Sequence, residues 1–136
     1  MCCRAPGERK SATLNEMTKN VLGGALQTCC TSPLTGFFRD GKCNTGPEDH
    51  GQHTVCVLVT DEFLRHQASI GNDLITPRPE WGFAGLKPGD GWCVCVEPWK
   101  ASYDAGVHAP VRLEATHEKA LEVVTLEMLV KCARKN

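Results

Sequence analysis

The stretch HTVCVLVT, residues 53–60, decides the fold, because it is the most strand-like segment of the 136-residue chain. Its β-branched and apolar side chains follow one another almost without interruption, which is typical of a strand buried on both faces. We therefore expect a central strand here. Thr60 can cap a helix over residues 61 to 69 or 70, and Gly71 then provides its end.

Further elements are predicted downstream of this strand and helix. Residues 92–97 (WCVCVE) alternate with a period of two, which predicts a second strand. Pro98 suits the first turn of a helix over residues 99–105. Residues 111–116 are expected to form a third strand, followed by a short helix that Thr116 caps and that runs through Leu121. Thr125 caps a final helix, whose predicted apolar stripe comprises Leu126, Leu129, Val130 and Ala133.

The composition bounds the architecture and the classes of partner. Hydrophobic residues make up 41% and charged residues 23% of the chain, which excludes global disorder. The net charge of −1 provides no basic field, so we expect no nucleic-acid partner. No apolar run approaches the roughly 20 residues that cross a bilayer, so no transmembrane segment is expected. The sequence does not predict the oligomeric state.

The predicted fold class is α+β. We expect a small single domain over residues 20–136, with a short mixed sheet, packed helices and long irregular loops rich in glycine and proline. Residues 1–19 lack periodicity and are predicted to form a flexible leader. Two loops are unusually long, the first loop (residues 28–52) and the second loop (residues 72–91). Long loops that belong to compact domains are frequently functional.

Four stretches of the chain carry a family resemblance: NVLGGALQTCC (20–30), SPLTGFFRDGKCNTGPEDHGQHTVC (32–56), GNDLITPRPEWGFAGLKPGDGWCVC (71–95) and LEATHEKALEVVTLEML (113–129). They resemble the family catalogued as domain of unknown function 2237, over residues 20 to about 131. The resemblance implies a compact α+β domain. It brings no reaction, substrate or cofactor with it, and the residues themselves identify no cofactor.

The chain departs from the pattern of that family at three positions. Ser32 stands where an acidic residue is common, Lys42 where a second cysteine is common, and Cys132 where a histidine is common. A site that needs a thiol at position 42 or an imidazole at position 132 is therefore not expected in this chain.

Nine cysteines raise the question of their redox state and location. The number is odd, and the first 20 residues lack the apolar segment of a secretory signal. We therefore expect a cytoplasmic protein with mostly reduced thiols. Cys2 and Cys3 are candidate acylation sites, although an unmodified leader is the simpler interpretation.

A metal site is one hypothesis for these thiols. Cys93 and Cys95 share one face of the predicted strand, about 6.6 Å apart, which is too far for a disulfide between them. That separation is tolerable for two ligands of one zinc ion. The remaining ligands of the ion would come from Cys29, Cys43, His53 or His117. The four-thiol set is Cys29, Cys43, Cys93 and Cys95. Alternatively, the paired cysteines are small core residues.

Thiol catalysis is a second hypothesis, with Cys43 as nucleophile and His53 or His117 as base. Cys43 follows Lys42, so its local charge favours a thiolate. His117 stands at a predicted helix N-terminus, where the dipole disfavours imidazolium, although a capping role is the simpler interpretation. His53 and Cys56 have an odd offset and should lie on opposite faces of one strand, which excludes them as a pair.

A pocket for a small polar or anionic ligand is the leading hypothesis. The first loop supplies Arg39, Asp40, Asn44 and Asp49, and the second supplies Asp73 and Arg78. An arginine can bind a carboxylate or phosphate through two hydrogen bonds. We expect the site where the two loops meet, near Cys93, Cys95 and His117. The alternatives are the thiol enzyme, a zinc-binding module, and a purely structural or interaction domain.

Overall fold

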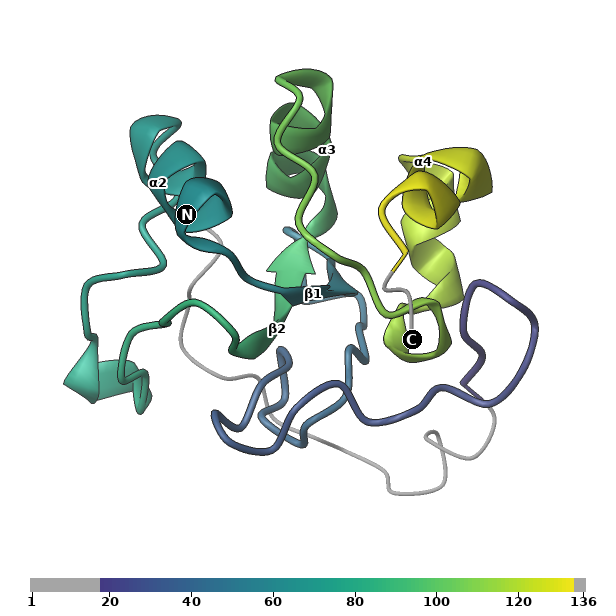
Figure 1. Cartoon of the computed structure of the whole chain (residues 1–136). Coiled ribbons are helices and arrows are strands. Elements are labelled where there is room, and N and C mark those ends of the chain that lie inside the picture. The colour runs from purple at the N-terminus through teal and green to yellow at the C-terminus, as the bar shows by residue number, and fades with distance from the viewer. Residues whose placement is uncertain (1–17, 134–136) are drawn as a thin grey trace.

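The structure is a computed structural model, and it describes residues 18–133 (Figure 1). Its strands and helices are β1 (His53–Leu58), α2 (Asp61–Ser69), β2 (Gly91–Cys95), α3 (Val96–Asp104) and α4 (Leu126–Lys131). Single turns of 3-10 helix, η1 (Pro79–Trp81), η2 (Leu113–Ala115) and η3 (Glu118–Glu122), interrupt the loops. The predicted α+β single domain is confirmed. The predicted leader, with Cys2 and Cys3, lies outside the described residues up to position 17.

The sheet is an antiparallel ribbon of β1 and β2. Cys56 pairs with Cys93, and Leu58 pairs with Gly91. A bulge interrupts the register, because His53 pairs with Cys95 while Val55 already pairs with Val94. Thr54 is therefore the extra residue of β1, and such a residue reverses the alternation of side chains around it.

The predicted third strand over residues 111–116 is wrong. Val111 makes only isolated bridges, antiparallel to Val57 and parallel to Ala133, and these lie outside the two-stranded antiparallel sheet. The chain then turns into η2, where the backbone N–H of Ala115 donates to the carbonyl of Arg112. These local hydrogen bonds use the backbone groups that a strand would present to its neighbour.

The helices begin where their capping residues predict. Thr60 Oγ1 accepts from Phe63 N at 3.1 Å and starts α2, and Thr125 Oγ1 accepts from Met128 N at 3.2 Å and starts α4. α3 begins at Val96, earlier than expected, because Pro98 fits the first turn of a helix without losing a hydrogen bond. The short helix predicted after Thr116 is the 3-10 helix η3, and its N-cap is His117, so the predicted Thr116 cap is wrong. The Thr116 hydroxyl instead donates to Arg112 O and accepts from Cys56 N.

The apolar core lies between the ribbon and the helices. Figure 1 shows α2, α3 and α4 side by side on one side of β1 and β2, with the first loop on the other side. Val55, Val94, Phe63 and Trp99 all belong to this core. The predicted stripe of α4 is only partly right: Leu129 is fully buried, whereas Leu126 is 38% and Val130 51% exposed.

The first loop is fixed to the opposite face of the ribbon. Phe37 is buried and meets Phe38 edge to face, with 5.0 Å between the ring centroids. The hydroxyl of Thr35 accepts from Cys93 N at 2.8 Å, which ties the loop to β2. Gly91 has no room for a side chain, because a Cβ there would lie 2.9 Å from the Cβ of Cys30.

No helix within residues 18–133 has the length and apolar character that crossing a membrane requires. This finding agrees with the sequence, which contains no long apolar run.

Phe63 provides a test of the core. It is fully buried in α2, so Phe63→Ala should lower the free energy of unfolding by about 3–5 kcal/mol through lost burial and the cavity left behind. Val130→Ala, on exposed α4 surface, is the control and should change stability by no more than about 0.5 kcal/mol. Urea unfolding followed by tryptophan fluorescence measures both. Equal effects of the two substitutions would contradict the assigned core.

Candidate functional site

The redox state of the cysteines differs from the expectation of mostly reduced thiols. Cys29 forms a disulfide with Cys56, and Cys43 forms one with Cys93. Cys95 is disulfide-bonded as well. Among the cysteines within residues 18–133, only Cys30 and Cys132 are free thiols. The expectation of mostly reduced thiols is therefore wrong for this form of the protein.

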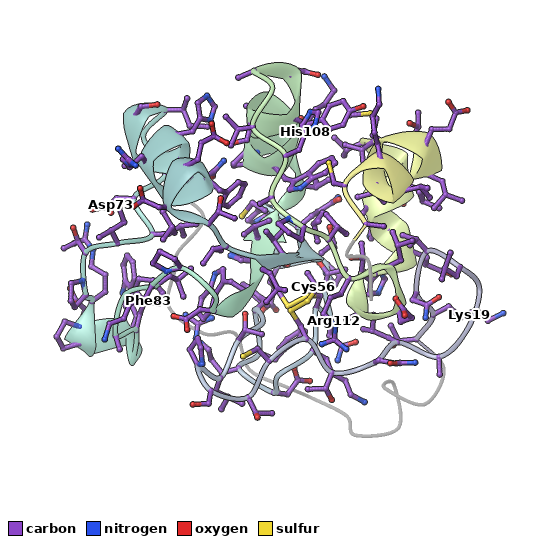
Figure 2. The ribbon with its side chains drawn as sticks, viewed as in Figure 1. Lys19, Cys56, Asp73, Phe83, His108 and Arg112 are labelled. Carbon is purple, nitrogen blue, oxygen red and sulfur yellow. A yellow bond between two sulfur atoms is a disulfide. The ribbon has the colours of Figure 1, made fainter. Side chains whose placement is uncertain are left out.

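The two disulfides lie together on the face of the ribbon that the first loop covers. We call the residues Cys29, Cys43, Cys56 and Cys93 the four-cysteine cluster. The sulfur atoms of Cys29, Cys43 and Cys93 all lie within 4.8 Å of one another. Cys56, bonded to Cys29, is their neighbour, and all four side chains are buried. Figure 2 shows the disulfide at Cys56 close to Arg112.

The predicted metal ligands are thus partly brought together. Cys29, Cys43 and Cys93 converge, while Cys95 is not one of the grouped ligands. Cys95 instead lies near Gly51, where an added Cβ would come within 2.6 Å of its sulfur. Cys56, which is not among the predicted metal ligands, is the fourth cysteine of the cluster, because it pairs with Cys93 in the sheet and is bonded to Cys29.

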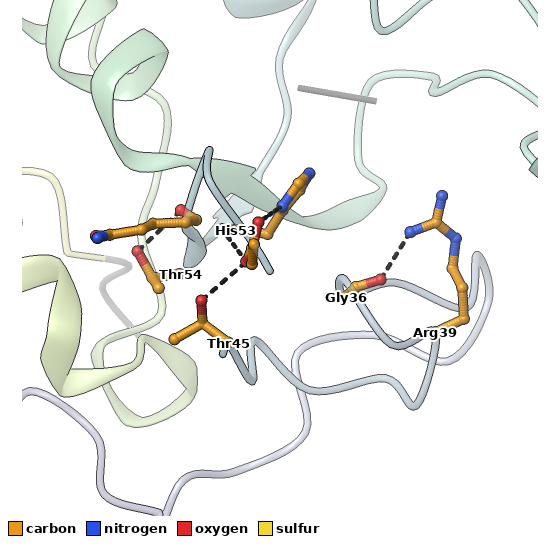
Figure 3. Close-up of polar contacts among 7 residues, drawn as sticks. Gly36, Arg39, Thr45, His53 and Thr54 are labelled. Atoms are coloured by element: carbon orange, nitrogen blue, oxygen red, sulfur yellow. Dashed lines mark hydrogen bonds and ion pairs between the residues drawn. The ribbon is translucent and has the colours of Figure 1, made fainter. Parts of the chain in front are cut away.

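A buried carboxylate and imidazole form a second polar centre beside the cluster. Asp49 Oδ1 and His53 Nδ1 are 2.6 Å apart, and both side chains are almost inaccessible to solvent. The other carboxylate oxygen accepts from His53 N at 2.8 Å and from Thr45 Oγ1 at 2.9 Å. Figure 3 shows Thr45 and His53 on either side of this carboxylate. Burial raises the pKa of Asp49, but hydrogen bonds and the charge of His53 outweigh it and lower the pKa overall.

The bulge at Thr54 changes which sulfur His53 faces. Because it adds one residue to β1, His53 and Cys56 share a face, opposite Cys95 and Cys93 respectively. The inference that His53 and Cys56 lie on opposite faces is therefore wrong. His53 also packs against Phe37, with 5.7 Å between the ring centroids.

The structure does not supply Cys43 as a nucleophile. Its sulfur is bonded to Cys93 and its side chain is fully buried, so no thiolate exists there in this form. His53 is held by Asp49, and the sulfur that the ribbon places opposite its ring belongs to Cys95. The hypothesis of an enzyme with Cys43 as nucleophile is therefore incompatible with the oxidised protein.

His117 acts as a helix cap. Its Nδ1 accepts from Lys119 N at 2.9 Å at the start of η3, and its own backbone N–H donates to Thr54 O. Burial lowers the pKa of the imidazole, and the nearby Lys119 lowers it further against the opposing effect of Glu118. The capping interpretation explains this residue without a catalytic role.

Both loops contact the Trp92 ring of β2, the first through Arg39 and the second through Phe83. The guanidinium carbon of Arg39 lies 5.3 Å from the centroid of the Trp92 ring, and Arg39 Nη1 donates to Gly36 O at 2.7 Å (Figure 3). Phe83 of the second loop packs against the same indole, with 5.2 Å between centroids. Trp92 is only 2% exposed, and its Nε1 has no hydrogen-bond partner among the described residues.

The remaining predicted ligand residues have local partners. Asp40 accepts from Lys42 N at 3.1 Å and from Asn44 Nδ2 at 3.0 Å. Asp73 accepts from two backbone N–H groups of its own turn, and hydrogen bonds from Thr76 and Ile75 lower its pKa. Arg78 lies over Trp81, 5.5 Å from the ring centroid. Capping of loop backbone therefore accounts for Asp40 and Asp73.

The sequence did not identify Trp92 or Cys56 as site residues. Trp92 belongs to the alternating segment that predicts β2, and no sequence signal indicates that its indole N–H lacks an acceptor. The signal for Cys56 was its position in a strand, but its role depends on the pairing of that strand with β2.

Comparison with known proteins adds a family. The family described as "Uncharacterized protein conserved in bacteria (DUF2237)" matches residues 19–133, nearly all of the described chain. No curated protein shows significant similarity to the chain.

The carboxylate of Asp49 should contribute stability that depends on pH. Because its pKa is lowered from 3.8, its contribution is complete above that value and is lost as the pH falls through the lower folded value. Asp49→Asn should therefore cost about 1–3 kcal/mol at pH 7, and the difference from wild type should shrink in strong acid. Urea unfolding of both proteins between pH 7 and strong acid measures this difference in the free energy of unfolding.

The control for this substitution is Asp61→Asn, which removes an exposed carboxylate paired with Arg65 on α2. It should change stability by less than about 1 kcal/mol. A difference between Asp49→Asn and wild type that grows on acidification would contradict the assignment.

Proposed function

The chain belongs to the uncharacterised DUF2237 family, and from the site alone we propose that it binds a small anion, a carboxylate or a phosphate, at Arg39 and Trp92. This proposal keeps the leading hypothesis from the sequence and narrows its ligand contacts. Arg39 is the charged contact, and the Trp92 indole provides a second hydrogen-bond donor. Asp40 and Asn44 support the loop that presents Arg39.

The observation that carries the proposal is the unsatisfied Nε1 of Trp92. A buried donor without an acceptor costs about 1–3 kcal/mol, so buried indole N–H groups usually have a partner. A partner for the Trp92 indole N–H must be a hydrogen-bond acceptor, and the oxygens of carboxylates and phosphates are such acceptors. The guanidinium over the same ring attracts the same kind of group, so both donors favour one class of ligand.

The backbone at Arg39 supports the same interpretation. Arg39 has a φ of 54°, in the left-handed region that residues other than glycine seldom adopt. Such conformations concentrate at ligand sites, where the surrounding structure holds them in place. Here the hydrogen bond to Gly36 and the stacking on Trp92 hold the side chain over the indole.

A cytoplasmic location is part of this proposal. Cys30 is a half-buried free thiol directly after the disulfide-bonded Cys29. In an oxidising compartment a free thiol next to a disulfide invites exchange, whereas a reducing compartment keeps such a thiol stable. Under reducing conditions the disulfides of the four-cysteine cluster would be open.

The test is a titration of the protein with inorganic phosphate and, separately, with acetate, followed by ¹H–¹⁵N NMR of the indole groups. The Trp92 Nε1–H signal should shift as the donor gains an acceptor, while the signals of Trp81 and Trp99 shift much less. Single Trp→Phe variants assign the three signals. Arg39→Gln should abolish the shift, and Arg39→Lys should weaken it because lysine cannot form the paired hydrogen bonds.

Arg65→Gln serves as the matched control, since Arg65 lies exposed on α2 and pairs with Asp61. It should leave the response of Trp92 unchanged. A Trp92 signal that does not move with either anion, or that moves equally in Arg39→Gln, would contradict the proposal.

A further inference from the structure

We propose that Cys29, Cys43, Cys56 and Cys93, once reduced by a dithiol, bind one zinc ion in a tetrahedral site made of four thiolates. This metal site is separate from the anion site at Arg39 and Trp92. It rests on four buried cysteines from three separate segments of the chain: the sulfurs of Cys29, Cys43 and Cys93 lie within 4.8 Å of one another, and Cys56 is bonded to Cys29. Two come from the first loop, one from β1 and one from β2.

The spacing of the sulfurs suits zinc. A Zn–S bond of about 2.3 Å places the sulfurs of a tetrahedral site about 3.8 Å apart. The sulfurs of Cys29, Cys43 and Cys93 already lie within 4.8 Å of one another. Opening the disulfides frees each bonded pair to separate. The proposed site then requires rotation about the Cα–Cβ bonds, above all at Cys56, whose sulfur lies outside this group. Four soft thiolates in a tetrahedron select zinc over hard cations.

The backbone around the cluster is held by hydrogen bonds that do not involve sulfur. Cys56 N donates to Thr116 Oγ1 at 3.2 Å, and Cys93 N donates to Thr35 Oγ1 at 2.8 Å. Both threonines are fully buried. Cys29 N donates to a carbonyl of its own loop at 2.7 Å. Reduction therefore leaves a frame that keeps the thiols together.

Arg112 supplies positive charge beside the cluster. Its Nη1 donates to Cys29 O at 3.0 Å, and its backbone N–H donates to Cys56 O at 2.9 Å. Figure 2 shows Arg112 next to Cys56. Four thiolates around Zn²⁺ leave a net charge of about −2, which a neighbouring guanidinium stabilises.

The oxidised and the zinc-bound forms exclude each other. A dithiol gives two electrons and two protons to each disulfide and becomes a disulfide itself, so that both reductions yield four thiols. Zinc then replaces the thiol protons, which pass to the solvent. Because each sulfur bonds either to another sulfur or to zinc, oxidation of the thiolates by a disulfide releases the ion.

The test uses the full chain, reduced with dithiothreitol, stripped of metal with a chelator and then given zinc without oxygen. Elemental analysis after desalting should find one zinc per reduced chain and none on the oxidised chain. Cobalt in place of zinc should give the visible absorption bands of a tetrahedral thiolate site. A reduced chain that keeps its far-ultraviolet circular dichroism but takes up no zinc would overturn the proposal.

Alkylation mapped by mass spectrometry identifies the ligands without any substitution. Zinc should protect the four-cysteine cluster, whereas Cys30 should react. Loss of a residue that only supports a zinc ligand weakens metal binding roughly 10–100-fold. Cys56→Ser removes a ligand itself and should weaken zinc binding by more than that. Cys132→Ser is the control and should bind zinc as the wild type does. Protection of Cys95 in place of Cys56, bound iron instead of zinc, or equal zinc uptake by the oxidised chain would overturn the assignment.

Discussion

The pairing of β1 with β2 is the constraint on which the rest of the molecule depends. One face of this ribbon carries valines that pack against the helices, and the other carries sulfur and the His53 ring. Most of the remaining chain is irregular, so these two strands supply the rigid reference to which the loops attach. The opposite chemistry of the two faces separates the apolar core from the four-cysteine cluster.

The loops hold their positions through specific contacts with that ribbon. In the first loop these are the cysteine sulfurs, the Thr35 hydroxyl and the Asp49 carboxylate, each of which reaches a residue of β1 or β2. A loop this long pays a large conformational entropy on ordering, and several independent attachments offset it. The same attachments bring Arg39 over Trp92, where the second loop also arrives through Phe83.

Local signals in the sequence were sufficient where the determining interaction is local. The strand β1 and the threonine caps of α2 and α4 follow from short patterns. The prediction failed for residues 111–116, where the alternation of Val111, Leu113 and Ala115 suggested a strand, but Val111 makes only single bridges to its neighbours. It also failed for Val130, because the width of an apolar stripe depends on what packs against the helix.

The sequence by itself determined the α+β fold class and the position of strand β1, because propensity and capping act over a few residues. The expected central position of that strand is not found, because the sheet has only two strands among the described residues. Only the tertiary structure decided which sulfurs meet. The bulge at Thr54 and the register of β1 on β2 place Cys56 beside Cys93 and leave Cys95 opposite His53. Register is a property of two strands whose paired ends, Leu58 and Gly91, lie 33 positions apart in the sequence (91 − 58). Over such a separation, local patterns carry no information about pairing.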